Sequence, residues 1–95
     1  MQVGEFEWDD AKAARNWQDH GVRFETAGEA FKDIFAIEWA DDGHGDAEQR
    51  FIIVGMVENR LLFVCYTLRT DRIRIISARE AEPRERRRYH EQNQT

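Results

Sequence analysis

The fold is decided by one stretch, residues 69–79, which reads Arg-Thr-Asp-Arg-Ile-Arg-Ile-Ile-Ser-Ala-Arg. The isoleucines favour a β-strand over Arg72–Ala78, and the Thr-Asp pair before it is typical of a turn. From Arg69 to Arg88 the chain holds eight of its fourteen Lys and Arg residues and four of its nineteen Asp and Glu residues. This segment therefore carries a formal charge of +4 in a protein whose remaining residues carry −9.

A strand of arginines is a candidate anion-binding site. The guanidinium group is planar, stays charged, and can bind one phosphate through two donors. The alternative is that these arginines neutralise the protein's own carboxylates on a solvated face of a sheet. The net charge of −5 and the pI near 5.2 argue against indiscriminate wrapping of nucleic acid, because one local patch must overcome the repulsion from phosphate.

The length of 95 residues predicts a single domain spanning residues 1–95, with one core and a surface groove rather than a deep cavity. The single Cys65 lies in an apolar run, so we expect a buried, unreactive thiol and no intrachain disulfide. No apolar run has the length of a transmembrane helix, and the first residues lack the pattern of a signal peptide. These features predict a cytoplasmic protein with no membrane contact.

Two further β-rich runs, Phe51–Val57 and Leu61–Leu68, precede the arginine strand. The links between the three runs are short enough to join only antiparallel neighbours, which predicts a meander. The almost continuous apolar run of Leu61–Leu68 predicts a central strand covered on both faces, and a fourth strand is expected at Ala36–Trp39. Strict alternation along the arginine strand assigns one side to Ile73, Ile75, Ser77 and Arg79, and the other to Arg72, Arg74, Ile76 and Ala78.

Helices are expected on both sides of these strands in the sequence. The first begins at Asp9-Asp10, where a carboxylate can cap the free amides, and ends at His20-Gly21. The second runs from Phe24 to Asp33, with apolar residues at helical spacing. A polar helix over Glu82–Gln92 closes the chain, with Tyr89 as its apolar anchor and the tyrosine hydroxyl in water. The fold class is therefore α+β, with two N-terminal helices, a small antiparallel sheet of about four strands and a C-terminal helix, and the three tryptophans are expected in its core.

Residue patterns along these elements resemble the BrnT toxin family. The chain opens with Phe6-Glu7-Trp8-Asp9, ends its first helix with His20-Gly21-Val22, and carries the run Arg72–Arg79. The resemblance covers nearly the whole chain in the right order. The remaining matching positions are Lys12, Asn16, Phe24, Ala27, Ala30-Phe31, Asp33, Glu48, Arg50, Gly55, Thr67, Arg69, Glu85-Arg86 and Tyr89.

The resemblance implies a RelE-like fold and the toxin of a type II toxin-antitoxin pair, a small ribonuclease that cuts RNA and lowers translation. It also implies a cognate antitoxin with a ribbon-helix-helix DNA-binding region, so that operator DNA is bound only through the antitoxin. The chain departs from the family at Asp19, where the family often has lysine, and at Arg23 and Gly28 in the second helix. If that lysine helps to hold RNA, this chain has weaker activity or a different RNA preference.

Metal-independent RNA cleavage by the 2′-hydroxyl requires a base, an acid and fixed cations beside the phosphate. Arg69 and Arg79 are the candidate cations, and His20 and Glu48 are the candidates for proton transfer, with His44 as a less constrained alternative. Arg69 and Arg79 are expected most of a strand's length apart, which suits two phosphates of one RNA strand. The structural alternatives are that His20 satisfies carbonyls at a helix end and that Glu48 pairs with a neighbouring arginine.

Six further residues are candidate contacts. Lys12, Arg50, Arg72 and Arg74 are expected to bind RNA phosphates, and Arg86 and Tyr89 to contact the antitoxin or RNA. The sequence has no Cys/His cluster and no glycine-rich phosphate loop, so we expect neither a metal nor a cofactor. A second possible function is a non-catalytic binding module that uses the same basic sheet surface to hold an acidic partner segment.

Overall fold

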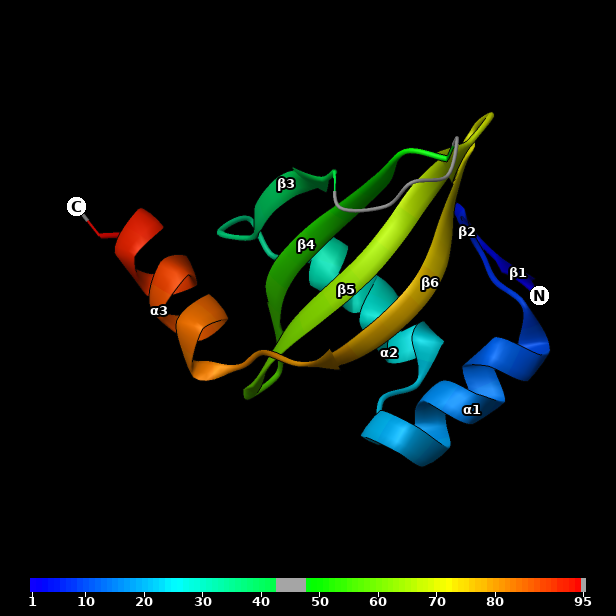
Figure 1. The fold of residues 1–95 in the computed structure, drawn as a ribbon, viewed down its shortest axis with the longest axis horizontal. Helices are drawn as coiled ribbons and strands as arrows, with labels where there is room; N and C mark the ends of the chain where they lie inside the picture. The colour runs from blue at the N-terminus through cyan, green and yellow to red at the C-terminus, as the bar shows by residue number, and fades with distance from the viewer. Residues whose placement is uncertain (43–47, 95) are drawn as a thin grey trace.

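The computed structural model describes residues 1–42 and 48–94, which form an α+β fold around one mixed sheet (Figure 1). The strand order is β1-β2-β6-β5-β4-β3. The strands are β1 (Gln2–Val3), β2 (Phe6–Glu7), β3 (Ile37–Asp41), β4 (Arg50–Val57), β5 (Arg60–Arg69) and β6 (Arg72–Glu80). The helices are α1 (Asp10–His20), α2 (Phe24–Gly28), the 3-10 helix η1 (Glu29–Lys32) and α3 (Pro83–Gln92). Within the described residues no helix is long and apolar enough to cross a membrane.

The meander of β4, β5 and β6 is antiparallel, and β5 lies at its centre, as the sequence predicts. The prediction of about four strands was incomplete, because β1 and β2 form a hairpin at the edge of the sheet. β2 pairs with β6 in the parallel direction, so the sheet is mixed rather than purely antiparallel. Strands of two residues are too short to show an alternating pattern, and they become visible only through their pairing with β6.

The second helix is shorter than predicted. It is α-helical only over α2 and continues as the tighter η1, which ends before Asp33. Arg23 supplies no side-chain cap at its start, and a regular helix interior disfavours Gly28. The 3-10 segment packs closely on β4, where a β-carbon at Gly55 would lie 2.5 Å from the carbonyl oxygen of Ala30. Only glycine allows this approach.

The main core lies between one sheet face and α2 with η1, which run behind the sheet in Figure 1. Trp8 and Phe24 meet edge to face within it. The expectation that all three tryptophans are core residues was wrong for Trp17, which is 46% exposed on α1 with the guanidinium of Arg23 above its ring. The buried members of this cluster are Trp8, Val22, Phe24, Ala27, Ala30, Ile53, Val57, Leu62, Val64, Tyr66, Ile75 and Ala78.

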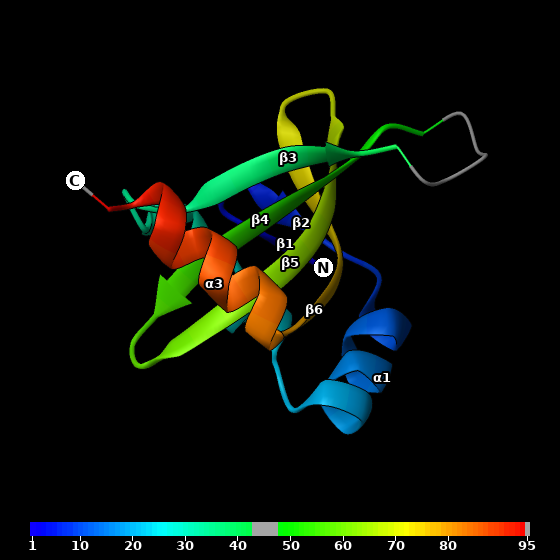
Figure 2. The ribbon, with the colours of Figure 1, turned by 60° about the vertical axis from the view of Figure 1, so that its left-hand side comes forward.

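The opposite sheet face is covered at one end by α3, which packs across β4 and β5 in Figure 2. Tyr89 is the buried residue of this helix, as predicted, but its hydroxyl is not in water. It donates to Asp33 at 2.7 Å, and Asp33 also accepts from the Met56 amide at 2.8 Å. The helix is therefore fixed to the segment between η1 and β3 by a hydrogen bond to a carboxylate. The other end of the same face carries most of the arginines of the sheet.

Candidate nucleic-acid interface

Five arginines share the sheet face on which α3 packs, and this surface is called the arginine face below. Cross-strand partners in an antiparallel sheet lie on the same face, as do residues two apart on one strand. Thr67 of β5 is opposite Arg50 of β4 and Arg74 of β6, while Arg69 is opposite Arg72. Arg79 is opposite Phe63, which lies on this same face of β5. The register therefore places five residues on one face: Arg50, Arg69, Arg72, Arg74 and Arg79.

A β-bulge in β6 puts Arg79 on this face. Cys65 pairs with Ser77 and the next residue, Tyr66, pairs with Ile75, which leaves Ile76 as the extra residue. The alternation is reset at this point, so the predicted division of the strand was right up to Ile76 and wrong for Ser77, Ala78 and Arg79. The isoleucines before the bulge and Ala78 after it belong to the main core, whereas Ser77 and Arg79 join the arginines.

Arg69 and Arg72 form a directly opposed pair beside the β5–β6 turn. Like charges in this arrangement destabilise a sheet by roughly 0.2 to 1 kcal/mol relative to neutral residues. The turn itself has Thr70 at a φ of 52°, a conformation that a β-branched residue disfavours. The repulsion between the two arginines and the unfavourable φ of Thr70 both destabilise the same turn. Other residues at these positions would make a hairpin with only a structural role more stable. The arrangement suits a surface selected for binding an anion.

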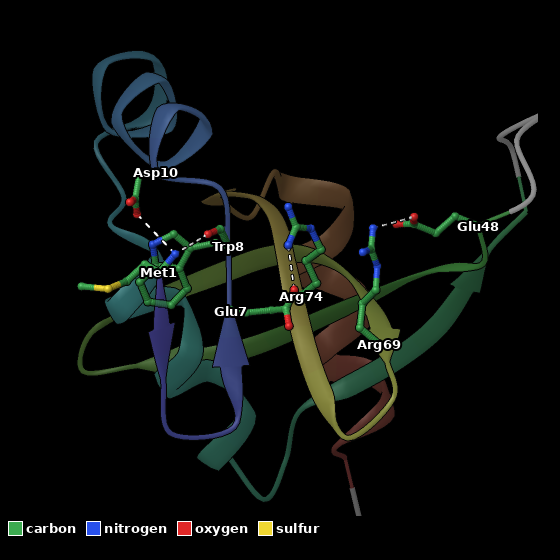
Figure 3. Close-up of polar contacts among 7 residues, drawn as sticks. All are labelled: Met1, Glu7, Trp8, Asp10, Glu48, Arg69 and Arg74. Carbon is green, nitrogen blue, oxygen red and sulfur yellow. Dashed lines mark hydrogen bonds and ion pairs between the residues drawn. The ribbon is translucent and has the colours of Figure 1, made fainter.

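Arg69 and Arg74 are each paired with a carboxylate, and Figure 3 shows both arginine side chains extending the same way from their strands. Arg69 meets Glu48 at 3.3 Å, and the two side chains are 51% and 37% exposed. Arg74 meets Glu7 at 2.7 Å in a less exposed pair, 28% and 18%. An exposed ion pair contributes only about 0 to 1 kcal/mol, so a phosphate can displace Glu48 from Arg69 at little cost. Displacing Glu7 from Arg74 costs more.

Arg79 is held more firmly than the other arginines. Its guanidinium binds the carboxylate of Glu85 through two hydrogen bonds of 2.8 Å and lies 4.0 Å above the ring of Phe63. The hydrogen bonds to Glu85 raise the pKa of Arg79. Burial favours a higher pKa for Glu85, but its bonds with Arg79 and the Glu82 amide outweigh burial and lower the pKa overall. The pair joins β6 to the start of α3.

His20 and Lys12 are brought together, away from Glu48. Both line a cleft of about 260 Å³ between α1 and β6, with Arg15, Asn16, Asp19, Ile76 and Ser77. Ser77 is opposite Cys65, four residues before Arg69 on β5, which is about 13 Å along the strand. The two candidates for proton transfer therefore do not meet at one phosphate. Arg69 and Arg79 are also separate, by about 20 Å along β5, because Arg79 pairs with Phe63.

Asn16 joins α1 to β6 at the cleft. It was not predicted as a site residue from the sequence. It is buried, and its amide nitrogen donates to the carbonyls of Ala78 and Val22 at 2.8 and 3.0 Å. Its side-chain oxygen accepts from the Ala78 amide at 3.1 Å. The side chain thus pairs with the β6 edge as a neighbouring strand would, beyond the point where β2 ends. Its sequence signals are its match to the BrnT family pattern and its position between Lys12 and His20 on α1, and neither indicates this role.

The sequence candidates not yet described lie apart from the arginine face and from this cleft, and Arg50 lies on the arginine face. Arg86 is exposed on α3, Tyr89 is buried beneath that helix, and His44 lies outside the described residues. Arg50 is opposite Asp41, near Cys65, whose burial raises the pKa of the thiol. A separate hollow of about 720 Å³ carries Glu25, Glu29 and Glu58 and would repel phosphate. The described residues contain no group of three or more His, Cys, Asp or Glu side chains placed to hold a metal ion.

Comparison with known families gives these surfaces a context. Residues 8–85 match the family described as the ribonuclease toxin, BrnT, of type II toxin-antitoxin systems. The chain belongs to the BrnT family. The match confirms the resemblance seen in the sequence, and it spans α1, the whole meander and the start of α3. No curated protein sequence matches the chain.

The BrnT family consists of ribonuclease toxins of type II toxin-antitoxin systems, so membership implies an antitoxin as the partner of this chain. The matched region contains every residue of the arginine face and of the α1–β6 cleft. Arg86 and Tyr89 lie just beyond it. Arg15 and Ser77 line the cleft of this BrnT family member without having been predicted, because an isolated arginine on a helix and a serine in a strand carry no pattern of their own.

Proposed function

We propose that this BrnT family member is a metal-independent endoribonuclease that binds a single RNA strand along β6. The proposal is carried by one observation, the placement of Arg50, Arg69, Arg72, Arg74 and Arg79 on one sheet face of an acidic protein. A rigid row of guanidinium groups suits successive phosphates of a flexible strand. The body, with a charge of −9 outside residues 69–88, confines the RNA to this surface.

Arg69 and Glu48 are the pair best arranged for cleavage. In the proposed step the Glu48 carboxylate accepts the proton of a ribose 2′-hydroxyl, and the resulting oxyanion attacks the adjacent phosphorus. The bond from phosphorus to the 5′-oxygen breaks, leaving a 2′,3′-cyclic phosphate, and water protonates the departing 5′-oxygen. Arg69 and Arg72 stabilise the charge that develops on the phosphoryl oxygens. Arg79 acts mainly by holding α3 through Glu85, and His20 acts at a second position in the cleft.

The antitoxin is proposed to inhibit by covering the arginine face. A segment rich in Asp and Glu would compete with RNA for the same guanidinium groups, and a ribbon-helix-helix region of that antitoxin would bind operator DNA. Binding of this kind needs no change in the toxin fold, because Arg69 is exposed and Arg72 beside it is only half-buried, with a hydrogen bond to the Gly4 carbonyl.

A second candidate function is favoured by the ion pairs themselves. Arg74 and Arg79 are each joined to a carboxylate at 2.7 to 2.8 Å, which is the state expected of a surface that holds acidic side chains rather than RNA. On this view the chain is a non-catalytic module that uses the arginine face to hold an acidic partner segment. It would retain the antitoxin surface of the family without RNA cleavage.

Induced expression separates the two functions. The chain is expressed alone as the parent and as Arg69→Ala, Arg79→Ala, Glu48→Gln and Arg60→Ala, and growth and the integrity of cellular RNA are followed. Arg60 is the matched control, because it lies on the same strand, is exposed and pairs with Glu80 at 3.0 Å, but faces away from the arginine face. The ribonuclease predicts growth arrest and RNA cleavage by the parent and Arg60→Ala, and the loss of both in Arg69→Ala and Glu48→Gln.

Folding and antitoxin binding are measured on the same purified variants. A variant that folds and still binds the antitoxin, but no longer cleaves RNA, supports the enzyme. A parent chain that binds the antitoxin but neither arrests growth nor cleaves RNA supports the module. Arrest retained by Arg79→Ala would assign Arg79 to the anchoring of α3, whereas arrest abolished in a well-folded Arg79→Ala would assign it to RNA.

A further inference from the structure

The α1–β6 cleft gathers two cations, Lys12 and Arg15, for which the described residues show no ion pair. On α1 its lining residues are Lys12, Arg15, Asn16, Asp19 and His20, at spacings of three and four that place them on one helical face. Within the described residues neither Lys12 nor Arg15 makes an ion pair, in contrast to Arg69, Arg74 and Arg79 on the arginine face. The concavity therefore presents cationic groups outside ion pairs beside the strand on which the RNA is proposed to lie.

The chemistry of the lining suits one phosphate with part of its nucleotide. Lys12 and Arg15 supply charged donors, His20 supplies a ring nitrogen, and the Ser77 hydroxyl donates from the strand side. Ile76, the half-buried extra residue of the bulge, gives an apolar contact for a ribose or base. The volume of about 260 Å³ is below the roughly 300 to 1,000 Å³ typical of pockets for drug-sized ligands, so a single nucleotide is the largest fitting unit.

The floor of the cleft is rigid on both sides. The hydrogen bonds of Asn16 with Ala78 fix the middle of α1 to the β6 edge, which positions the backbone of Lys12 and His20 beside Ser77. Asp19 is the acidic residue of the lining and opposes the binding of an anion. Its charge weakens the attraction but leaves two cations against one carboxylate.

We propose that the α1–β6 cleft is a subsite for one phosphate-bearing nucleotide of the RNA strand, bound by Lys12, Arg15 and Ser77 and adjusted by Asp19. This inference rests on the proposed function, since it assigns the cleft to the same RNA that lies along the arginine face. It gives Asp19 a role in setting how tightly this nucleotide is bound.

Binding is tested on the full chain by nuclear magnetic resonance, with inorganic phosphate, a nucleoside 3′-monophosphate and a short single-stranded RNA as separate probes. The signals of the His20 ring, the Lys12 and Arg15 side chains and the Ser77 amide are expected to shift together with the nucleotide. Lys12→Gln and Arg15→Gln each remove a charged hydrogen-bond donor, so each is expected to weaken binding about tenfold, and Asp19→Asn to strengthen it several-fold. The matched control is Arg23→Gln, which removes an exposed arginine that lies close to α1 and outside the cleft.

The outcomes separate this inference from the proposed ribonuclease. Shifts confined to the cleft and sensitive to Lys12→Gln support the subsite even if no RNA is cleaved, in which case only the ribonuclease is rejected. An equal decrease of affinity in Arg23→Gln would show a diffuse electrostatic effect and overturn the subsite. Cleavage and RNA binding unchanged by Lys12→Gln and Arg15→Gln together would also overturn it. Inorganic phosphate binding as tightly as the nucleotide would assign the cleft to a free anion and reject the nucleotide assignment.

Discussion

Asn16 makes the contact on which the position of α1 depends. Two of its three hydrogen bonds satisfy both backbone groups of Ala78 at an edge that β2 leaves uncovered, and the third is donated to the Val22 carbonyl. We expect Asn16→Ala to lower the free energy of unfolding by about 3 kcal/mol, because each buried polar group left unpaired costs roughly 1 to 3 kcal/mol. Urea unfolding measures this. Gln18→Ala, at an exposed position of the same helix, is expected to change stability by less than about 0.5 kcal/mol.

Asn16→Asp tests whether the pairing of Asn16 with β6 needs both a donor and an acceptor. A carboxylate can still accept from the Ala78 amide, but it cannot donate to the Ala78 carbonyl and would face that oxygen directly. The variant is therefore expected to be at least as unstable as Asn16→Ala. A stability equal to that of the parent would show that the hydrogen bonds are not what holds the helix.

Gly55 is a second position at which one atom decides the packing. A β-carbon there would lie 2.5 Å from the Ala30 carbonyl oxygen and 3.1 Å from its β-carbon, so η1 would have to move away from β4. We expect Gly55→Ala to lower the free energy of unfolding by about 1 to 3 kcal/mol, as overpacking usually does. Thermal unfolding followed by circular dichroism provides the measurement. An unchanged midpoint would mean that η1 shifts at no cost.

At the scale of elements, α3 buries Tyr89 and is joined to the rest of the fold by polar contacts, with Tyr89 bonded to Asp33 and Glu85 to Arg79. Burial, with the hydrogen bond and charge of Asp33, raises the pKa of Tyr89 to about 12 from its usual 10.0. For Asp33 burial alone would raise the pKa, but bonds from the Met56 amide, the Tyr89 hydroxyl and the Phe35 amide outweigh burial and lower the pKa overall. The folded state therefore holds the tyrosine proton more tightly than the unfolded chain.

The stabilisation from Tyr89 is expected to be complete below pH 10 and to be lost as the pH rises towards 12. Tyr89→Phe is expected to cost about 1.5 to 3 kcal/mol at neutral pH, the range for a hydrogen bond to a charged group. The stability of Tyr89→Phe is also expected to decrease less than that of the parent as the pH rises above 10. Tyr66, whose pKa is raised to about 12 by burial and Glu38, accounts for the part that remains. If the free energy of unfolding decreased equally with pH in the parent and in Tyr89→Phe, the result would contradict a stabilising hydrogen bond between Tyr89 and Asp33.

The elements also show where sequence patterns suffice. The meander, the end of α1 at Gly21 with its φ of 65°, and the buried Tyr89 follow from periodicity and residue type, which act locally. The bulge at Ile76 does not, because an extra residue changes no composition and is defined only by the partner strand. One unpredicted residue therefore moved Arg79 to the other face. The ion pairs of Arg74 and Arg79 likewise join residues whose proximity only the fold creates.

At the scale of the whole molecule, the charge distribution decides how RNA is bound. The net charge of −5 repels a polyanion at long range, while the arginine face and the α1–β6 cleft attract it locally. Salt screens both effects, but the ions released from phosphates on binding make the affinity fall with salt by a slope of about −0.7 per phosphate neutralised for single strands. Four cations, Arg69, Arg72, Lys12 and Arg15, give an expected slope of about −3 in a plot of log affinity against log salt.

Removal of one of these cations should reduce the magnitude of that slope by the contribution of one phosphate. We expect Arg72→Gln to lower its magnitude by about 0.7 and to weaken binding most at low salt, because one fewer counterion is then released. Arg60→Gln makes the same change in net charge on the other sheet face, so it should shift the affinity slightly and leave the slope unaltered. The measurement is fluorescence anisotropy of a labelled single-stranded RNA over a range of salt concentrations. The two variants change the net charge equally, so they can differ in slope only if phosphates bind at the arginine face. Equal slopes would therefore mean that RNA responds to the total charge of the protein.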